Sequence, residues 1–333
     1  MSNPRTCSLP DICFTREQTE RRVGIEIEIS GLSYRRLVQL VAGLLNGEAV
    51  EASRYVSKVE TALGSFAIEL DSDPIKDLDI QDEELPEAIR ELGEQAIQLI
   101  DAAAEKIVPL EIVTPPIPFT DLERIEYLCN QLREAGALGS REAIYYAFGL
   151  QLNPELPDLR TATLLRYLRA FACLYDWLKA RHQLDISRKL TSYIEPWDNL
   201  FVDRLIESGY APTMSELMVD YLRDNPTRNR ALDLLPLFAH LNPELLADYT
   251  SDPRIKARPT LHYRLPDCDI DNPQWHFSTV WNDWVVVEQL AHNASDLSEL
   301  MTEFRNSRKL SLHNLTHSWL DTCHQWLQTR GYV

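Results

Sequence analysis

The chain has 333 residues, of which 44% are hydrophobic and 25% are charged, as in an ordinary globular protein. Acidic residues outnumber basic ones by 51 to 33, and the formal net charge is −18. This surplus argues against binding to nucleic acid or to acidic membranes, because both need clustered Lys and Arg. The sequence contains no run of 18 apolar residues, so no transmembrane helix is predicted.

The cellular compartment is predicted from the cysteines and the N-terminus. Six cysteines are scattered without a CxxC pair, so neither a zinc ribbon nor a thioredoxin-type motif is expected. The first 20 residues read as a polar leader whose prolines and charges are unlike a signal peptide. We therefore expect a cytoplasmic protein with free thiols.

The first half of the chain alternates between strand and helix patterns. Arg22–Ile29 changes between polar and apolar residues at period two, which predicts a half-buried strand. Ser33 predicts the N-cap of a helix that ends near Leu45. Further strands are expected over Ala49–Val59, Ser65–Leu70, Ile107–Val113 and Tyr145–Asn153, and further helices from Pro86 to Glu105 and, capped by Thr120, to Ala135.

The second half is mainly helical. Residues 161–182 predict a long amphipathic helix, and shorter helical segments continue to about residue 248. One late strand, Pro259–Leu265, should rejoin the N-terminal sheet, because a lone strand cannot satisfy its backbone hydrogen bonds. Three final helices are expected over Trp281–His292, Ser295–Arg305 and Leu312–Thr329.

These patterns predict an α+β fold, with strands interleaved with helices in the first half and a helical second half. After the leader (residues 1–20), we expect one interwoven domain over residues 21–333. Its parts are a strand-rich region (21–155), a helical insertion (156–250) and the late strand with the C-terminal helices (251–333).

Isolated acids recur in the apolar strands. Glu26 and Glu28 are two residues apart and point to the same face of one strand, while Glu69 and Glu111 each stand in another short strand. Four carboxylates around one cavity would repel one another, and a divalent cation removes that repulsion. Carboxylate oxygens suit Mg²⁺ or Mn²⁺. Separate solvated faces are the alternative.

Basic residues accompany these acids. Lys76 follows the strand that contains Glu69, and Arg258 and Arg264 flank the late strand. An Arg guanidinium can hold phosphate oxygens in a bidentate manner. Surface pairing with the acidic majority is the alternative.

The ordered motifs GIEIE, GSFAIELDSDPIK, LEIVTPP, FGLQLNPE and RPTLHYRLPD resemble the amidoligase family over about residues 20–290. That family belongs to the carboxylate–amine ligases with a glutamine-synthetase-like fold, which include the glutamate–cysteine ligases. The resemblance implies an ATP-dependent ligase whose mainly antiparallel sheet of about six strands forms a half-open funnel with helices on its outer side. Strand carboxylates in this fold bind two or more Mg²⁺ around the ATP phosphates.

The resemblance also implies roles for individual residues. Gln151 and Asn153 occupy the positions at which related ligases carry His or Asn, so they are expected to line the nucleotide or metal site. Within the late strand only Arg264 matches directly, and His262 replaces a glutamate as a metal ligand. The implied metal ligands are Glu26, Glu28, Glu69, Glu111 and His262, and the implied catalytic cations are Arg258, Arg264 and Lys76.

The leading hypothesis is an ATP- and Mg²⁺-dependent ligase that joins a carboxylate to an amine through an acyl phosphate. Its substrates are expected to be small molecules or peptides. A metal-dependent hydrolase using the same carboxylates and a degenerate, non-catalytic binding protein are the alternatives. The oligomeric state stays open, with a homo-oligomer as one option, and a companion glutamine amidotransferase or peptide-modifying enzyme would suit the chemistry.

Overall fold

The computed structural model describes residues 6–53, 55–70, 109–140, 148–182, 194–311 and 318–333. In these residues one open sheet has the strand order β2-β3-β4-β5-β1-β7-β9-β8, and β6 pairs with the start of β1. Every pairing is antiparallel. The strands are β1 (Arg22–Ile29), β2 (Glu48–Ser53), β3 (Val56–Thr61), β4 (Gly64–Leu70), β5 (Leu110–Val113), β6 (Ile117–Pro118), β7 (Leu150–Pro154), β8 (Leu232–Asp233) and β9 (His262–Tyr263).

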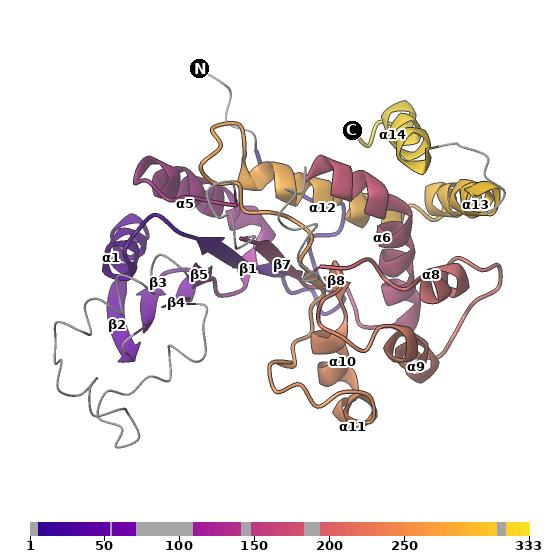
Figure 1. Cartoon of the computed structure of the whole chain (residues 1–333), viewed down its shortest axis with the longest axis horizontal. Helices are drawn as coiled ribbons and strands as arrows, with labels where there is room; N and C mark the ends of the chain where they lie inside the picture. Colours follow the sequence, from indigo (N-terminus) through magenta and orange to yellow (C-terminus); the bar gives the residue numbers. More distant parts are fainter. Residues whose placement is uncertain (1–5, 54, 71–108, 141–147, 183–193, 312–317) are drawn as a thin grey trace, which may run out of the picture.

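The helices lie beside this sheet and beyond its β8 end, where α8 to α11 are grouped (Figure 1). Helices α13 and α14 pack against α6 on the side away from the sheet. The helices are α1 (Tyr34–Leu44), η1 (Phe119–Asp121), α5 (Glu123–Glu134), α6 (Thr161–Arg181), α8 (Asn199–Leu205), α9 (Met214–Asp224), α10 (Leu235–Leu241), α11 (Pro243–Ala247), α12 (Phe277–His292), α13 (Ala294–Ser311) and α14 (Trp319–Arg330). The mixture of helices with an open antiparallel sheet confirms the α+β prediction.

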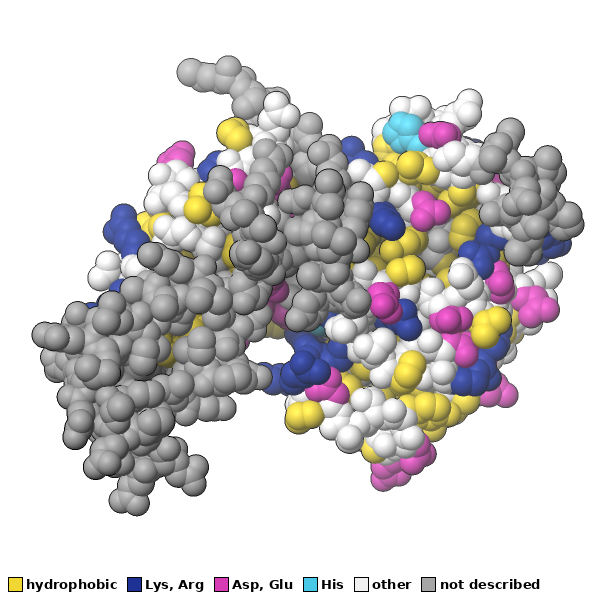
Figure 2. Space-filling view, viewed as in Figure 1, with side chains coloured by type: hydrophobic (Ala, Val, Ile, Leu, Met, Phe, Trp, Pro, Cys, Tyr) yellow, Lys and Arg dark blue, Asp and Glu magenta, His cyan; other side chains and the backbone are white. Residues whose placement is uncertain are grey.

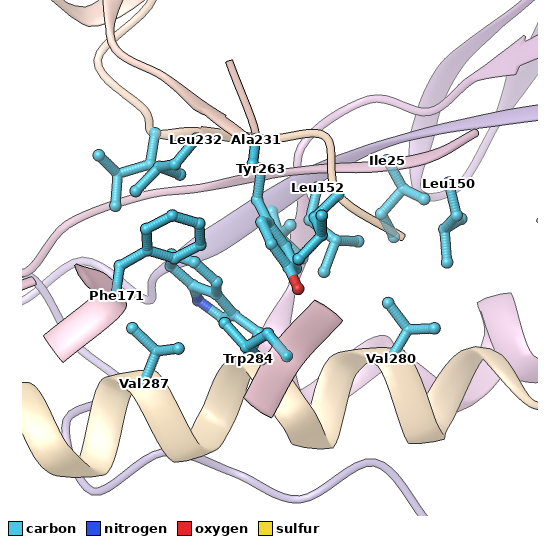
Figure 3. Packing of buried hydrophobic residues seen from close by; sticks show 14 of the residues in the cluster. Ile25, Leu150, Leu152, Phe171, Ala231, Leu232, Tyr263, Val280, Trp284 and Val287 are labelled. Atoms are coloured by element: carbon cyan, nitrogen blue, oxygen red, sulfur yellow. The ribbon is translucent and has the colours of Figure 1, made fainter. Parts of the chain in front are cut away.

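One face of the sheet forms the hydrophobic core. In β1 the side chains alternate, and Ile25, Ile27 and Ile29 are completely buried. Helix α12 runs beneath this face, where Trp284 packs against Tyr263 of β9 with ring centroids 5.2 Å apart (Figure 3). Because strand side chains alternate, the residues between these apolar positions must point to the opposite face. That opposite face carries the acids of β1.

The late strand rejoins the sheet as predicted. Strand β9 lies between β7 and β8, and Tyr263 is paired with Leu152 on one side and Leu232 on the other. Only two residues, His262 and Tyr263, form β9, fewer than the expected span of Pro259–Leu265. Strand β8 was not expected at all, and it lies in the region predicted to be helical.

The polar leader is anchored by a buried ion pair directly after it. Both nitrogens Nη1 and Nη2 of Arg21 donate to the Glu288 carboxylate, and both side chains are fully buried. Tyr167 donates its hydroxyl to the same carboxylate. The backbone carbonyl of Ser8 accepts a hydrogen bond from Trp281 of α12. The start of the described chain is thus bound to α6 and α12.

Two local predictions were wrong. Thr120 does not cap the helix that follows: it lies within η1 and donates to the Glu20 carboxylate, while Leu122 is the N-cap of α5. The segment Ala49–Val59 is not one strand but parts of β2 and β3, which pair with each other. Apolar periodicity alone cannot mark where one strand ends and the next begins when no Gly, Pro or Asn separates them. The helix expected from Pro86 to Glu105 lies outside the described residues.

Candidate active site

Three acids form a row across the sheet. Glu69 of β4 is paired with Glu111 of β5, and Glu111 is paired with Glu28 of β1. Directly paired side chains on neighbouring antiparallel strands have Cβ atoms about 4.5–5.5 Å apart. Glu26 lies on the same face of β1, two residues from Glu28. The structure therefore places all four acids that the sequence singled out on one face of the sheet.

The groups around Glu26 favour its ionised form. Its side chain is 12% exposed, and its Oε1 accepts hydrogen bonds from Asn153 Nδ2 at 2.9 Å and from Arg258 Nη1 at 3.0 Å. Burial favours the neutral acid, but nearby His262 and Arg258, together with these hydrogen bonds, hold the pKa of Glu26 below its ordinary value.

The two amide residues of β7 lie beside the two acids of β1. They differ in whether the amide oxygen has a hydrogen-bond partner. Gln151 Nε2 donates to Glu28 Oε1 at 2.9 Å, and Gln151 Oε1 contacts His262 Nε2 at 2.8 Å. Asn153 Nδ2 donates to Glu26, whereas the buried Asn153 Oδ1 has no hydrogen-bond partner among the described residues. A buried orphan acceptor calls for a ligand, an ion or a water molecule. The Asn153 oxygen can therefore accept a ligand without breaking a contact with a described residue, and the Gln151 oxygen cannot.

His262 is held in place from two sides. Its Nε2 contacts Gln151, and its Nδ1 lies 3.4 Å from Oδ2 of Asp233, which is completely buried. Burial lowers the pKa of His262, and Asp233 and Glu26 counteract this. Binding of a metal through Nε2 would require the contact with Gln151 to break. Asp233 is a site residue that sequence reasoning missed.

The two arginines of the late segment lie at the same end of the site but have different surroundings. Arg258 is 32% exposed and pairs with Glu26. Arg264 Nη1 donates to the backbone carbonyl of Arg228, and burial lowers the pKa of Arg264 while Asp233 opposes that effect. On the face seen in Figure 2, Lys and Arg side chains gather near the centre of the molecule. Lys76 lies outside the described residues.

A divalent cation suits the donor chemistry of this face. Carboxylate and amide oxygens are the ligands that Mg²⁺ and Mn²⁺ prefer, and Asn153 Oδ1 is an acceptor with nothing to satisfy it. In the described part of the chain, however, no three His, Cys, Asp or Glu side chains are gathered closely enough to hold a metal ion. The acids are in register on one face, and a cation would have to draw them together.

A separate cavity of about 470 Å³ lies along α6, away from the acids. Arg160, Arg166 and Arg169 contribute to its walls. Arg169 donates to the backbone carbonyls of Leu205 and Tyr210, so it ties α6 to the chain around α8. None of the residues predicted for the site lines this cavity.

The fold and the acidic face together define a class: an α+β protein whose open antiparallel sheet carries acids and amides on the face opposite the hydrophobic core. A sequence model of the family described as putative amidoligase enzyme matches residues 19–286. The match covers most of the chain, and the protein belongs to this family, which points to a ligase-type enzyme. A search of curated proteins gives no match. No helix in the described ranges is long and apolar enough to cross a membrane.

Proposed function

We propose that the protein is an ATP- and Mg²⁺-dependent ligase that joins a carboxylate to an amine. The observation that carries this proposal is the register of Glu69, Glu111 and Glu28 across three neighbouring strands. Such a row is unfavourable by itself, because like charges on directly paired strand residues destabilise a sheet. It becomes favourable where a divalent cation is bound.

The chain's own residues supply two parts of a phosphate-transfer site. Glu26, Glu28, Glu69, Glu111 and Asn153 Oδ1 would hold Mg²⁺, which neutralises phosphate charge when it is bound. Arg258 and Arg264 would contact phosphate oxygens, since a guanidinium pairs well with them. A protein of net charge −18 needs such cations wherever it binds an anionic nucleotide.

In the proposed reaction the γ-phosphoryl group passes from ATP to a carboxylate oxygen, and ADP leaves. An amine then attacks the carbonyl carbon of this acyl phosphate, phosphate departs, and loss of a proton leaves an amide. Neither step needs a nucleophilic side chain, so positioning and electrostatics provide the catalysis. This agrees with the acids, amides and arginines that the described residues contribute to the site.

The test measures ADP and phosphate release from ATP with mixtures of amino acids and amines. We expect the wild-type chain and Glu51→Gln, a substitution on the exposed strand β2, to release ADP, and Glu26→Gln to release none. Turnover without nucleotide would instead indicate a metal-dependent hydrolase. Absence of both turnover and ATP–Mg²⁺ binding in the wild type would indicate a non-catalytic protein.

A further inference from the structure

A continuous line of polar contacts crosses four neighbouring strands and ends at Glu28, one of the proposed metal-binding acids. It runs from Asp233 on β8 through His262 on β9 and Gln151 on β7 to Glu28 on β1. These strands are adjacent in the sheet order. Asp233 and His262 are directly paired residues, 0% and 1% exposed respectively.

The chemistry of Glu28 fixes the direction of each contact. An ionised carboxylate only accepts hydrogen bonds, so the Gln151 group 2.9 Å from Glu28 must be its NH₂. The Gln151 oxygen then faces His262, and His262 Nε2 must carry a proton to donate to it at 2.8 Å. Each member of the line thus determines the orientation of the next.

Asp233 is the far end of this line. Its Oδ1 accepts from the backbone N–H of Leu235, which leaves Oδ2 to face His262 Nδ1 at 3.4 Å. In the described part of the chain neither Oδ2 nor Nδ1 has a hydrogen-bond partner, so the contact between them is electrostatic. The imidazole ring of His262 therefore faces Asp233 with Nδ1 and Gln151 with Nε2.

We propose that Asp233 is a positioning residue of this site, which acts through His262 and Gln151 to fix the Glu28 carboxylate. The metal-binding part of this inference rests on the proposed function, but the geometric part does not. The other oxygen of Glu28 accepts from the backbone N–H of Gly149 at 2.7 Å, so the carboxylate is held from two directions. Groups that orient a metal-binding carboxylate affect metal affinity by about 10–100-fold.

The test compares Asp233→Leu with Asp233→Asn. Asn keeps an oxygen for Leu235, and its NH₂ can donate to His262 Nδ1, which keeps the proton on Nε2. Leu removes both contacts. We expect Asp233→Leu to weaken Mn²⁺ binding, measured by electron paramagnetic resonance, by about 10–100-fold, and Asp233→Asn to stay within about threefold of the wild type. Crystal structures should show Gln151 and Glu28 displaced only in Asp233→Leu.

A matched control separates positioning from general stability. Glu126 is also a buried carboxylate beside a histidine, with His276 Nδ1 at 2.9 Å, but it lies on α5. Glu126→Leu should lower the melting temperature as Asp233→Leu does, and leave Mn²⁺ affinity unchanged. If Asp233→Leu does not fold, His262→Phe removes the same link. Because His262 is itself an implied metal ligand, the displacement of Gln151 and Glu28 in the crystal structure of that variant is then the deciding result.

Three results would overturn the positioning role. In the first, Asp233→Leu binds Mn²⁺ like the wild type, and in the second its Glu28 stays in place. In the third, Asp233→Asn is as weak as Asp233→Leu, which would assign the effect to charge. A wild type that binds no Mn²⁺ would instead contradict the proposed function, while the crystal structures would still decide whether Asp233 positions Glu28.

Discussion

Arg258 Nη1 donates a hydrogen bond to Glu26 Oε1 at 3.0 Å, although the two residues are 232 positions apart in the chain. This ion pair joins the segment before β9 to the first strand of the sheet. Because Arg258 is 32% exposed, its guanidinium can also meet a ligand from solvent. The pair thus places a cation at the edge of the acidic face.

Removal of the Arg258 charge should weaken nucleotide binding. A hydrogen bond to a charged group is worth about 1.5–3 kcal/mol, so Arg258→Met should raise the Kd for ATP–Mg²⁺ by roughly 10–100-fold in calorimetric titrations. Arg254→Met is the matched control, because Arg254 is 65% exposed and pairs with Asp252. Equal affinities for Arg258→Met and the wild type would remove Arg258 from the nucleotide site.

A new carboxylate at position 153 should make stability depend on Mg²⁺. In Asn153→Asp the donor to Glu26 is replaced by a second acid, so we expect a lower melting temperature in EDTA and a larger rise on adding Mg²⁺ than in the wild type. Asn130→Asp makes the same change beside Glu126 on α5. That control should lose stability without recovering it in Mg²⁺. A similar response of both variants would argue against a cation at Asn153.

The buried pair of Arg21 and Glu288 should be essential for stability. Arg21→Met leaves the buried Glu288 carboxylate without its cation, and such a change typically costs about 3–5 kcal/mol of unfolding free energy. Urea denaturation at pH 7 measures this loss. Asp203→Asn breaks a surface pair with Arg308 and should cost less than about 1 kcal/mol. A loss below about 1 kcal/mol for Arg21→Met would contradict the inferred anchoring role.

Stability should fall in mild acid partly because of His292. Burial lowers the pKa of His292, its Nδ1 donates to the Glu288 carbonyl, and its Nε2 is buried without a partner in the described part of the chain. The unfolded chain therefore binds a proton below about pH 6.5 that the folded chain resists, so the unfolding free energy decreases as pH falls through that value. We expect His292→Gln to lose less stability than the wild type between pH 7.5 and 5.5.

The control for this pH dependence is His324→Gln, since His324 is exposed on α14. Its urea denaturation curves should follow those of the wild type at both pH values. Identical pH dependence in His292→Gln and the wild type would show that His292 does not contribute.

The acids of the site could be found from sequence because each stands alone among apolar residues in a strand. The alternation of polar and apolar residues in β1 is enough to predict, from sequence alone, that Glu26 and Glu28 share one face. Their register with Glu111 and Glu69 could not be predicted, since pairing depends on which strands become neighbours. Asp233 carries the same signal, an acid within ALDLLPLF, but a two-residue strand has no periodicity to reveal it.

The orientation of the Gln151 and Asn153 amide groups could not be predicted from sequence either. Gln151 and Asn153 were expected to act alike, yet the Gln151 oxygen faces His262 and the Asn153 oxygen has no described partner. This difference arises from β9, which is adjacent to β7 only in the folded sheet. A residue type can predict the donors and acceptors that are present, and only the neighbours decide which remain open.

The most direct measurement of the central claim is a crystal structure with Mg²⁺ and a non-hydrolysable ATP analogue. We expect the phosphates on the acidic face of the sheet, with Mg²⁺ about 2.0–2.1 Å from oxygens of the acid row and a phosphate oxygen within hydrogen-bond reach of Arg258 or Arg264. A nucleotide bound elsewhere, or no nucleotide at saturating concentration, would contradict assignment of this face as an ATP-dependent ligase site.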